Sequence, residues 1–271
     1  MKGSSRNAAL KAGEALEAAL AAGGSWGTLS DELFAVTGVI DGSASLRRAL
    51  ADPSREESAK AGLATSLFGA KVSAATTTVV AQVVGSRWSD ERDLTDTLES
   101  LAVQAQLAEA ERAGRIDRVE DELFRFDRIV AGDPGLRDTL SNRNVDAAGK
   151  VSLVHTLLAK KVAPETLRLA EQAVRAPRGR RLDRTLATYL KLAAIRRDEL
   201  TALVTAAAPL GAKQEARLRA ALEGIYGKSV TLQVVLDPEV MGGIRVQIGD
   251  EVVDGTILRR LEEARRHVTG S

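Results

Sequence analysis

The first stretch to consider as a site for chemistry is the glycine-rich DPEVMGGIRVQIGDEVVDGTILRRLEE, residues 237–263, because glycine-rich loops can bind phosphate groups. A phosphate-binding loop concentrates backbone amides at the start of a helix. Here Gly242 and Gly243 instead precede residues 244–248, where apolar and polar side chains alternate as in a half-buried strand. The segment also lacks the G-x-G-x-x-G and G-x-x-x-x-G-K-[ST] spacings, and its carboxylates would repel a phosphate. We therefore predict a structural hairpin rather than a phosphate site.

No other set of residues predicts catalysis. The chain has no cysteine, which excludes disulfides and thiolate metal sites. Its two histidines, His155 and His267, are far apart and show no ligand spacing, and the acidic residues are spread along expected helix faces. An enzyme needs a nucleophile with its base, a metal cluster or perturbed carboxylates. We predict a non-enzymatic protein with no catalytic, cofactor-binding or metal-binding residues.

The charge balance argues against nucleic acid as a partner. The 38 Lys and Arg residues nearly cancel the 37 Asp and Glu residues, whereas nucleic-acid binders usually carry a net basic surface. The one basic run, RAPRGRRLDR at residues 175–184, has no interleaved aromatic residues for base stacking. We expect a solvated turn between helices here, with an acidic protein surface as a second reading.

Membrane insertion is not expected either. The alanine-rich start of the chain is interrupted by Glu14 and Glu17, unlike a secretory signal. No window reaches the roughly 18 apolar residues of a membrane span. The sequence predicts a soluble, cytosolic chain, which can still dock on a membrane-bound partner.

The chain contains an internal repeat with an offset of 90 residues. SDELFAVTGVIDGSASLRRAL at 30–50 aligns without gaps with EDELFRFDRIVAGDPGLRDTL at 120–140, and the block DELF recurs at 31–34 and 121–124. Spaced matches such as Lys60 with Lys150 extend the similarity. Because fixed-period similarity indicates duplicated structural units, we predict a tandem duplication.

Each repeat is predicted to be helical. Apolar residues at helical spacing, such as those of 116–130, form one stripe per helix. Residues 89–114 contain no helix breaker before Gly114, so one long helix should close the first bundle and open the second. We expect five or six helices per unit, in bundles at residues 1–94 and 95–197.

The pattern changes near residue 198. Residues 198–210 and 229–237 are predicted strands, and 211–227 is an amphipathic helix with glycine just past its end. Asp254 is a candidate cap for a final helix whose apolar face includes Ile257. The predicted fold class is therefore α+β, with two tandem all-α helical bundles followed by a small α/β domain at residues 198–271.

The C-terminal segment resembles a known family, the delta subunit of F-type ATP synthases, the counterpart of the mitochondrial oligomycin-sensitivity-conferring protein. The resemblance covers about residues 98–268 and is most specific in LQVVLDPEVMGGIRVQIGD (232–250) and VVDGTILRRLEE (252–263). The residues that carry it are Asp237, Pro238, Gly242, Gly243, Gly249, Asp250, Asp254 and Gly255. Members of the family generally have one helical bundle, so this chain resembles a long form with an extra copy at 1–94.

The resemblance implies a non-catalytic stator subunit at the cytoplasmic face of the cell membrane, held there through the ATP synthase. It implies that a helical domain binds the N-terminal helices of the alpha subunits and that the C-terminal domain holds the b subunit. By analogy, the docking groove lies between the first and fifth helices of a bundle, near 103–112 and 164–174. Candidate contact residues are Leu107, Leu167 and Val174, which are equally suited to the core.

Two matters stay open from the sequence. Either bundle could dock on the catalytic head, because the counterparts of the candidate residues in the first copy are equally eligible by position. A different function is a helical adaptor that binds other amphipathic helices or an acidic partner surface.

Overall fold

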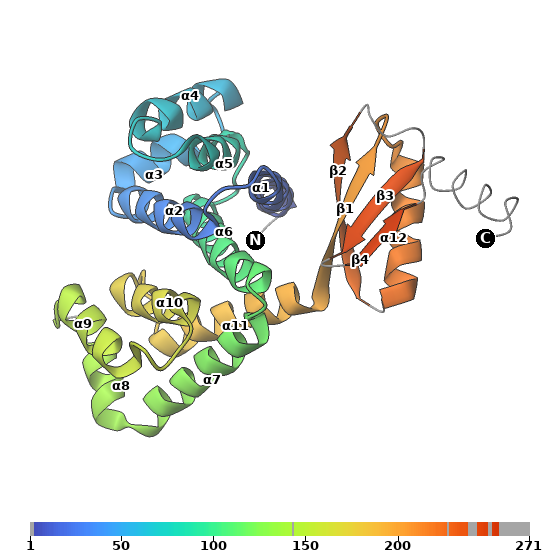
Figure 1. Cartoon of the computed structure of the whole chain (residues 1–271). Coiled ribbons are helices and arrows are strands. Elements are labelled where there is room, and N and C mark those ends of the chain that lie inside the picture. The colour runs from blue at the N-terminus through green and yellow to red at the C-terminus, as the bar shows by residue number, and fades with distance from the viewer. Residues whose placement is uncertain (1–2, 143, 227, 238–242, 249–250, 255–271) are drawn as a thin grey trace, which may run out of the picture. The chain divides into compact units, whose positions relative to one another are not determined.

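The computed structural model describes residues 3–142, 144–226, 228–237, 243–248 and 251–254. It divides the chain into two compact units, Met1–Arg196 and Arg197–Ser271. The first unit is helical, and the second combines a helix with a β-sheet (Figure 1). The coarse prediction, a helical part followed by a small α/β part, is therefore confirmed.

The helical unit is built from short helices with defined start signals. Ser25, Ser43, Ser73 and Asp133 each accept a hydrogen bond from a backbone amide of the helix that follows, a contact that stabilises a helix by about 1 kcal/mol. Its helices are α1 (Gly3–Ala21), α2 (Trp26–Asp41), α3 (Ala44–Ala51), α4 (Glu57–Phe68), α5 (Ala74–Gly85), α6 (Glu91–Arg112), α7 (Ile116–Gly132), α8 (Pro134–Ser141), α9 (Ala147–Leu158), α10 (Pro164–Arg175) and α11 (Leu182–Asp198).

The helix bounds repeat with the offset seen in the sequence. Helices α3, α4 and α5 recur as α8, α9 and α10 with both ends shifted by 90 residues, and α2 recurs as α7 within one residue. Core positions recur as well: Leu33 and Leu123 are both fully buried, and so are Leu50 and Leu140. The duplicated sequence therefore produces duplicated helices.

Helix α6 is the element that the two repeats share. It contacts α1 and α2 of the first repeat, and α7 and α10 of the second (Figure 1). Its buried side chains are found all around the helix rather than along one stripe, which is expected of a helix that is enclosed by neighbours. The predicted long helix over 89–114 is confirmed at Glu91–Arg112.

The C-terminal unit contains β1 (Glu199–Ala206), α12 (Ala212–Tyr226), β2 (Ser229–Leu236), β3 (Ile244–Ile248) and β4 (Glu251–Asp254). The strands described form a sheet in the order β2-β1-β3-β4, with β2 parallel to β1 and the other neighbours antiparallel. Helix α12 connects the two parallel strands, and its Leu222 packs with the apolar side chains of the sheet. The predicted strands and helix are therefore confirmed.

The hairpin predicted from the glycine-rich stretch is also present. Strands β3 and β4 pair antiparallel, with Ile248 opposite Glu251. Gly243, just before β3, has φ +83°, a backbone conformation that glycine adopts without strain. Asp254 ends β4, and the helix that it was expected to cap lies outside the described residues. The segment therefore forms part of a sheet, as the alternation of its side chains indicates.

Candidate functional site

The described residues contain no cluster typical of catalysis. His155 is largely exposed, and its Nδ1 lies 2.8 Å from a carboxylate oxygen of Glu171 on the neighbouring helix α10. No group of three or more His, Asp or Glu side chains in the described ranges is placed to hold a metal ion. The pair of His155 and Glu171 is a contact between two neighbouring helices, α9 and α10. His267 lies outside the described residues.

The acidic residue of the repeated DELF block ties two helices together in each repeat. Glu32 of α2 accepts hydrogen bonds from the backbone amide (3.1 Å) and hydroxyl (2.6 Å) of Ser73 and from the hydroxyl of Thr76, at the start of α5. Burial disfavours its charged form, but these hydrogen bonds outweigh burial, and the pKa of Glu32 lies below its ordinary value.

The second repeat has the equivalent contact. Glu122 of α7 accepts from the backbone amide of Ala163 and the hydroxyl of Thr166, both at 2.7 Å, at the start of α10. Burial again opposes the charged form, and the hydrogen bonds from Thr166 and Ala163 lower the pKa of Glu122. A carboxylate at a helix N-terminus also interacts favourably with the helix dipole. Each repeat thus has the same polar connection between its second and fifth helices.

A larger charge cluster joins the second repeat to α6 and to the first repeat. Arg178, in the segment between α10 and α11, donates to Glu99 (2.6 Å) and to the backbone carbonyl (3.2 Å) and hydroxyl (2.6 Å) of Thr95. The same guanidinium lies 2.8 Å from Asp96 and 3.4 Å from Asp41, at the end of α2. The cluster therefore connects three elements that are distant in sequence.

Glu99 is the centre of this cluster. Its side chain is only 5% exposed, and Arg180 donates to it at 2.5 Å. The Tyr189 hydroxyl of α11 donates to the same carboxylate at 3.4 Å, and burial, followed by the charge of Glu99, raises the pKa of Tyr189. Burial disfavours the charged form of Arg178, but Glu99 and its acidic neighbours raise its pKa. Buried charges are stable only when paired in this way.

The expectation of a solvated turn at residues 175–184 is correct only in part. The segment joins α10 to α11, and Arg175, Arg181 and Arg184 are exposed, but Arg178 and Arg180 pair with Glu99. The backbone of Arg178 has φ +51°, in the left-handed region, and Gly179 follows with φ +76°. Such a conformation costs a non-glycine residue about 1–2 kcal/mol. It turns the Arg178 side chain inward, where the acidic groups of α6 hold it. A local charge run does not reveal this, because the acceptors lie about 80 residues earlier in the chain.

A second arginine fixes the end of the helical unit. Arg196, near the end of α11, lies 2.7 Å from Glu111 of α6 and 3.0 Å from Glu17 of α1. Burial disfavours its charged form, but the charges and hydrogen bonds of these two carboxylates raise its pKa. The N-terminal helix, the shared helix and the last helix of the unit thus meet at one side chain.

The residues proposed to bind a partner occupy different environments. Leu107 and Val174 are buried in the core, and Leu167 is partly buried and packs against it. Their contact with a partner stays a prediction. Of the signature residues, Asp237, Gly243 and Asp254 are described, and the backbone amide of Asp237 donates to the carbonyl of Ala206 at 3.0 Å. Pro238, Gly242, Gly249, Asp250 and Gly255 lie outside the described residues.

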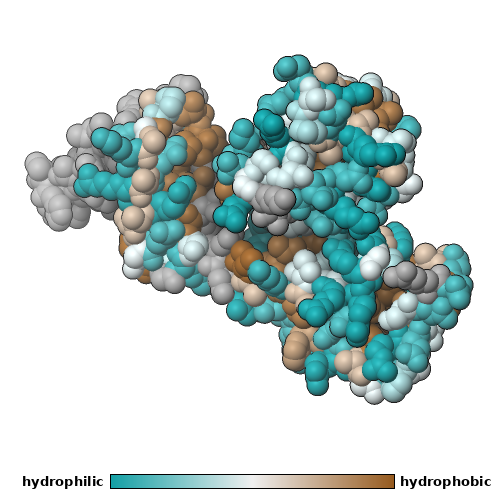
Figure 2. All heavy atoms as spheres, turned by 180° about the vertical axis from the view of Figure 1, so that it is seen from behind, coloured by the Kyte–Doolittle hydropathy of each residue, from teal (hydrophilic) through white to brown (hydrophobic). Residues whose placement is uncertain are grey.

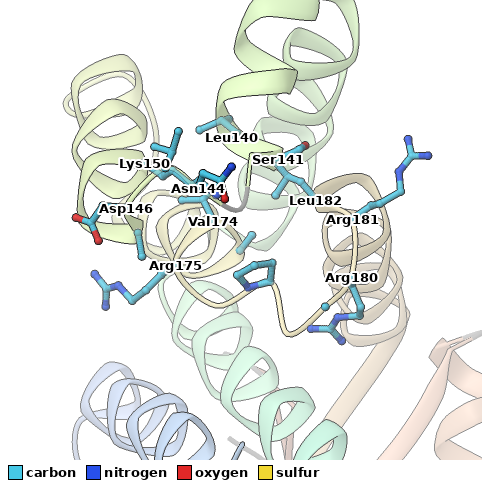
Figure 3. Close-up of a pocket in the computed structure, with 15 residues that line it drawn as sticks. Leu140, Ser141, Asn144, Asp146, Lys150, Val174, Arg175, Arg180, Arg181 and Leu182 are labelled. Carbon is cyan, nitrogen blue, oxygen red and sulfur yellow. The ribbon is translucent and has the colours of Figure 1, made fainter. Parts of the chain in front are cut away.

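A cavity of about 630 Å³ lies between α9, the end of α10 and the segment that follows it (Figure 3). Lys150, Arg175, Arg180, Arg181 and Asp146 line it together with apolar residues that include Val174. Figure 3 shows the side chains of Arg175 and Arg181 pointing away from its centre, and Arg180 pairs with Glu99. The cavity therefore lacks the convergent polar groups of a substrate pocket.

The helical unit is thus a set of helices joined by buried ion pairs, and the described part of the chain contains no group of side chains placed to hold a metal ion. The family model for the ATP synthase delta (OSCP) subunit matches residues 100–268. The chain belongs to this family. It is therefore a non-catalytic peripheral-stalk subunit of the F-type ATP synthase, in a membrane-bound complex that contains alpha and b subunits, and it functions in ATP synthesis and ion transport.

Relatives match over nearly the whole chain. The chain is 50% identical over 240 residues to the ATP synthase subunit delta of Streptomyces avermitilis, covering 89% of this chain and 88% of that protein. It is 47% identical to the corresponding subunit of Streptomyces coelicolor over 269 residues, 99% of this chain and 98% of that one. The subunit of Beutenbergia cavernae matches at 47% over 271 residues, all of both chains. The first helical repeat is thus part of these relatives too.

Among solved structures, a chain of the Toxoplasma gondii mitochondrial ATP synthase hexamer matches 62% of this chain and 94% of its own length, at 18% identity and a TM-score of 0.29. No helix in the described part of the chain combines the length and hydropathy needed to cross a bilayer.

Proposed function

We propose that the helical unit docks on the catalytic head by binding N-terminal helices of the alpha subunits, and that the C-terminal unit holds the end of the b subunit at the cytoplasmic face of the membrane. In this proposal the chain has three functional parts: a first bundle at 1–94, a second at 95–197 and an α/β domain at 198–271. The two bundles share α6 as the last helix of one and the first helix of the other. The paired helix bounds support this division.

The observation that carries the proposal is the internal fixation of the helical unit. A stator subunit must resist torque, so its docking platform has to keep its shape while its partners pull on it. Arg178 joins the second repeat to α6 and to Asp41, and Arg196 joins α11 to Glu17 and Glu111. The two helical repeats thus belong to one compact unit, which supports their acting as a single platform.

We assign the head-binding groove to the second bundle, on the side of α10 that carries Leu167. The side of α10 toward α6 already faces α2 of the same chain. The family match begins at residue 100, within α6, and so covers the second bundle but not most of the first. Leu167 of α10 is the candidate contact residue that is partly buried rather than enclosed, and its position lets an arriving helix cover it. Grooves between bundle helices accept amphipathic partner helices in this manner.

The test compares matched positions in the two bundles of the full-length chain. Leu167→Asp alters α10, and Thr77→Asp alters the equivalent position of α5, which is also partly exposed. Binding to a peptide with the N-terminal sequence of the alpha subunit is measured by calorimetry. We expect Leu167→Asp to weaken binding at least about tenfold, equivalent to about 1.4 kcal/mol, and Thr77→Asp to change it little.

The opposite result would assign the groove to the first bundle. If both variants bind as tightly as the unaltered chain, the helix groove is not the docking site. The adaptor alternative would then be favoured if the chain binds unrelated amphipathic helices with the same affinity as the alpha-subunit peptide.

A further inference from the structure

The repeated DELF block has two positions that behave alike in both repeats and two that do not. Its Glu connects the second and fifth helices, and its Leu is fully buried, in both copies. Its Phe differs: Phe34 is 9% exposed, whereas Phe124 is 53% exposed. Its Asp differs as well, because Asp31 lies 3.6 Å from Arg168 of the other repeat, whereas Asp121 pairs with Arg125 of its own helix.

In the first repeat, residues of the second repeat lie against Phe34 and its neighbours on α2. Phe34 lines a cavity of about 210 Å³ together with Gln172 and Ala176 of the second repeat. The Arg168 guanidinium lies directly over Gly27, where a Cβ atom would come within 2.5 Å of Nη1. Helix α10 and the residues after it therefore lie along one face of α2. Arg168 is close to the first part of that face, and Gln172 and Ala176 are close to its later part.

We define this face of α2 by Gly27, Asp31, Phe34, Gly38 and Asp41, which are spaced three, four or seven residues apart and so share one side of the helix. Arg168 lies at its start, near Gly27 and Asp31, and Arg178 lies at its end, 3.4 Å from Asp41. The covering segment therefore runs parallel to α2.

The equivalent face of α7 consists of Asp117, Asp121, Phe124, Arg128 and Ala131, and each of these residues is exposed. On the described part of the chain outside α7, the Asp121 carboxylate and the Phe124 ring have no recorded partner. Aromatic residues are enriched at protein interfaces, and the two carboxylates one turn apart place negative charge beside the exposed Phe124 ring.

We propose that this face of α7 binds a helix of another subunit of the complex. The partner helix runs parallel to α7, carries an Arg or Lys over Asp117 and Asp121, and has a small side chain over Phe124. The α2–α10 contact serves as the template. Asp117 replaces Gly27 of the template and adds a second carboxylate where Arg168 lies, which strengthens the requirement for a cation. Arg128 replaces Gly38, so the far end of the partner carries a polar or acidic residue.

A second copy of this chain does not fit the template. The surface of the first repeat equivalent to α10 is α5, where Thr78 stands in place of Arg168 and Gln82 in place of Gln172. The glutamine is kept, but the cation is missing. Association of two chains through α7 and α5 would leave Asp117 and Asp121 facing a threonine. The inference does not depend on which bundle binds the catalytic head.

The test uses the intact ATP synthase with a photoreactive p-benzoyl-phenylalanine in place of Phe124. After irradiation of the purified complex, crosslinked peptides are identified by mass spectrometry. The control carries the same group at Val39, which is similarly exposed but lies on another side of α2. We expect position 124, and not position 39, to crosslink to a helix of another subunit that has Arg or Lys about two turns before a small residue.

A charge test accompanies it. In the complex with the photoreactive group at 124, the double change D117K and D121K should lower the crosslink yield at least about tenfold. Asp138→Lys, a charge reversal at an exposed position of α8, should leave the yield unchanged. Thermal unfolding of each variant checks that the helical unit still folds.

Four results would overturn the proposal: no crosslink at 124 above the level at 39, a crosslink to a second copy of this chain, a crosslink to residues 197–271 of the same chain, or a crosslink to another subunit whose yield is insensitive to the two charge reversals.

Discussion

The two helical repeats have the same helices, but their polar contacts differ. In the first repeat the buried Lys60 donates to the backbone carbonyl of Ser86 at 2.7 Å, at the end of α5. Lys150, the equivalent buried lysine, has no recorded hydrogen bond or ion pair within the described part of the chain, and it lines the cavity of Figure 3. The segment after α10 is instead fixed through Arg178 and Glu99. The two repeats thus share buried leucines and the contacts of Glu32 and Glu122, whereas the segment after the fifth helix is held differently in each.

The largest effect is expected at that joint. Glu99→Ala leaves Arg178 and Arg180 buried without their main acceptor, and breaking a buried ion pair from one side costs about 3–5 kcal/mol. Arg125→Ala, which removes an exposed pair with Asp121, should cost less than about 1 kcal/mol. Thermal or denaturant unfolding of the full chain measures both. Equal stabilities of the two variants would show that the Glu99 cluster does not hold the repeats together.

The repeated phenylalanines, Phe34 and Phe124, should differ in how much they stabilise the folded chain. Phe34→Ala should destabilise the helical unit by about 3 kcal/mol, because it removes a mostly buried ring at the contact with α10. Phe124→Ala should change the stability of the isolated chain by no more than about 0.5 kcal/mol, as expected of an exposed position. Denaturant titration reports both values. A large loss from Phe124→Ala would mean that this ring already has a partner within the chain.

The repeated lysines should differ in the same direction. Lys60→Met leaves the Ser86 carbonyl without its donor, at a cost of about 1–3 kcal/mol. Burial lowers the pKa of Lys60, so part of this cost is offset by removing a charge from the interior. Lys150→Met breaks no recorded hydrogen bond and should be close to neutral. Paired melting curves of the two variants decide this, and identical shifts would contradict the difference drawn between the repeats.

The smallest effect concerns the two contacts that are alike. Glu32 and Glu122 have pKa values below the ordinary 4.5, so each contributes stability that is present above that value and is lost as the pH falls through the lower pKa of the folded state. Glu32→Gln and Glu122→Gln should each reduce the acid sensitivity of unfolding between about pH 5 and pH 3. Urea titrations at several pH values measure the slopes. An effect in only one repeat would show that the contacts are not equivalent.

Most of the surface of the helical unit that Figure 2 shows is polar. On the face seen in Figure 2, hydrophilic side chains predominate on the helical unit, with hydrophobic residues in smaller groups. The exposed apolar positions recur in part between the repeats: Val39 and Ile129 are both exposed, and so are Leu67 and Leu157. Phe124 is different because its counterpart is covered.

Most of the fold could be predicted from the sequence because its signals are local. The offset of 90 residues and the uninterrupted run of residues 89–114 indicate the helices without knowledge of long-range contacts. The alternation in β3 predicted the hairpin for the same reason. Where neighbouring residues determine an element, the sequence suffices.

The site was less predictable because it depends on pairs of residues that are distant in the chain. The run at 175–184 was interpreted as solvated, although Arg178 is held by groups of α6 and α2. The signals that were available were Glu99, which falls on a helix with apolar residues on every side, and the Pro-Arg-Gly turn at 177–179. Without the three-dimensional structure, neither signal shows that Glu99 and the arginine of this turn are partners.

We propose that the helical unit binds the catalytic head, and that it does so through the second bundle. Hydrogen–deuterium exchange of the full chain, with and without the purified head, tests it directly. We predict increased protection of α10, with α5 and residues 199–254 exchanging as in the free chain. Protection confined to residues 199–254, with α10 unchanged, would contradict this proposal.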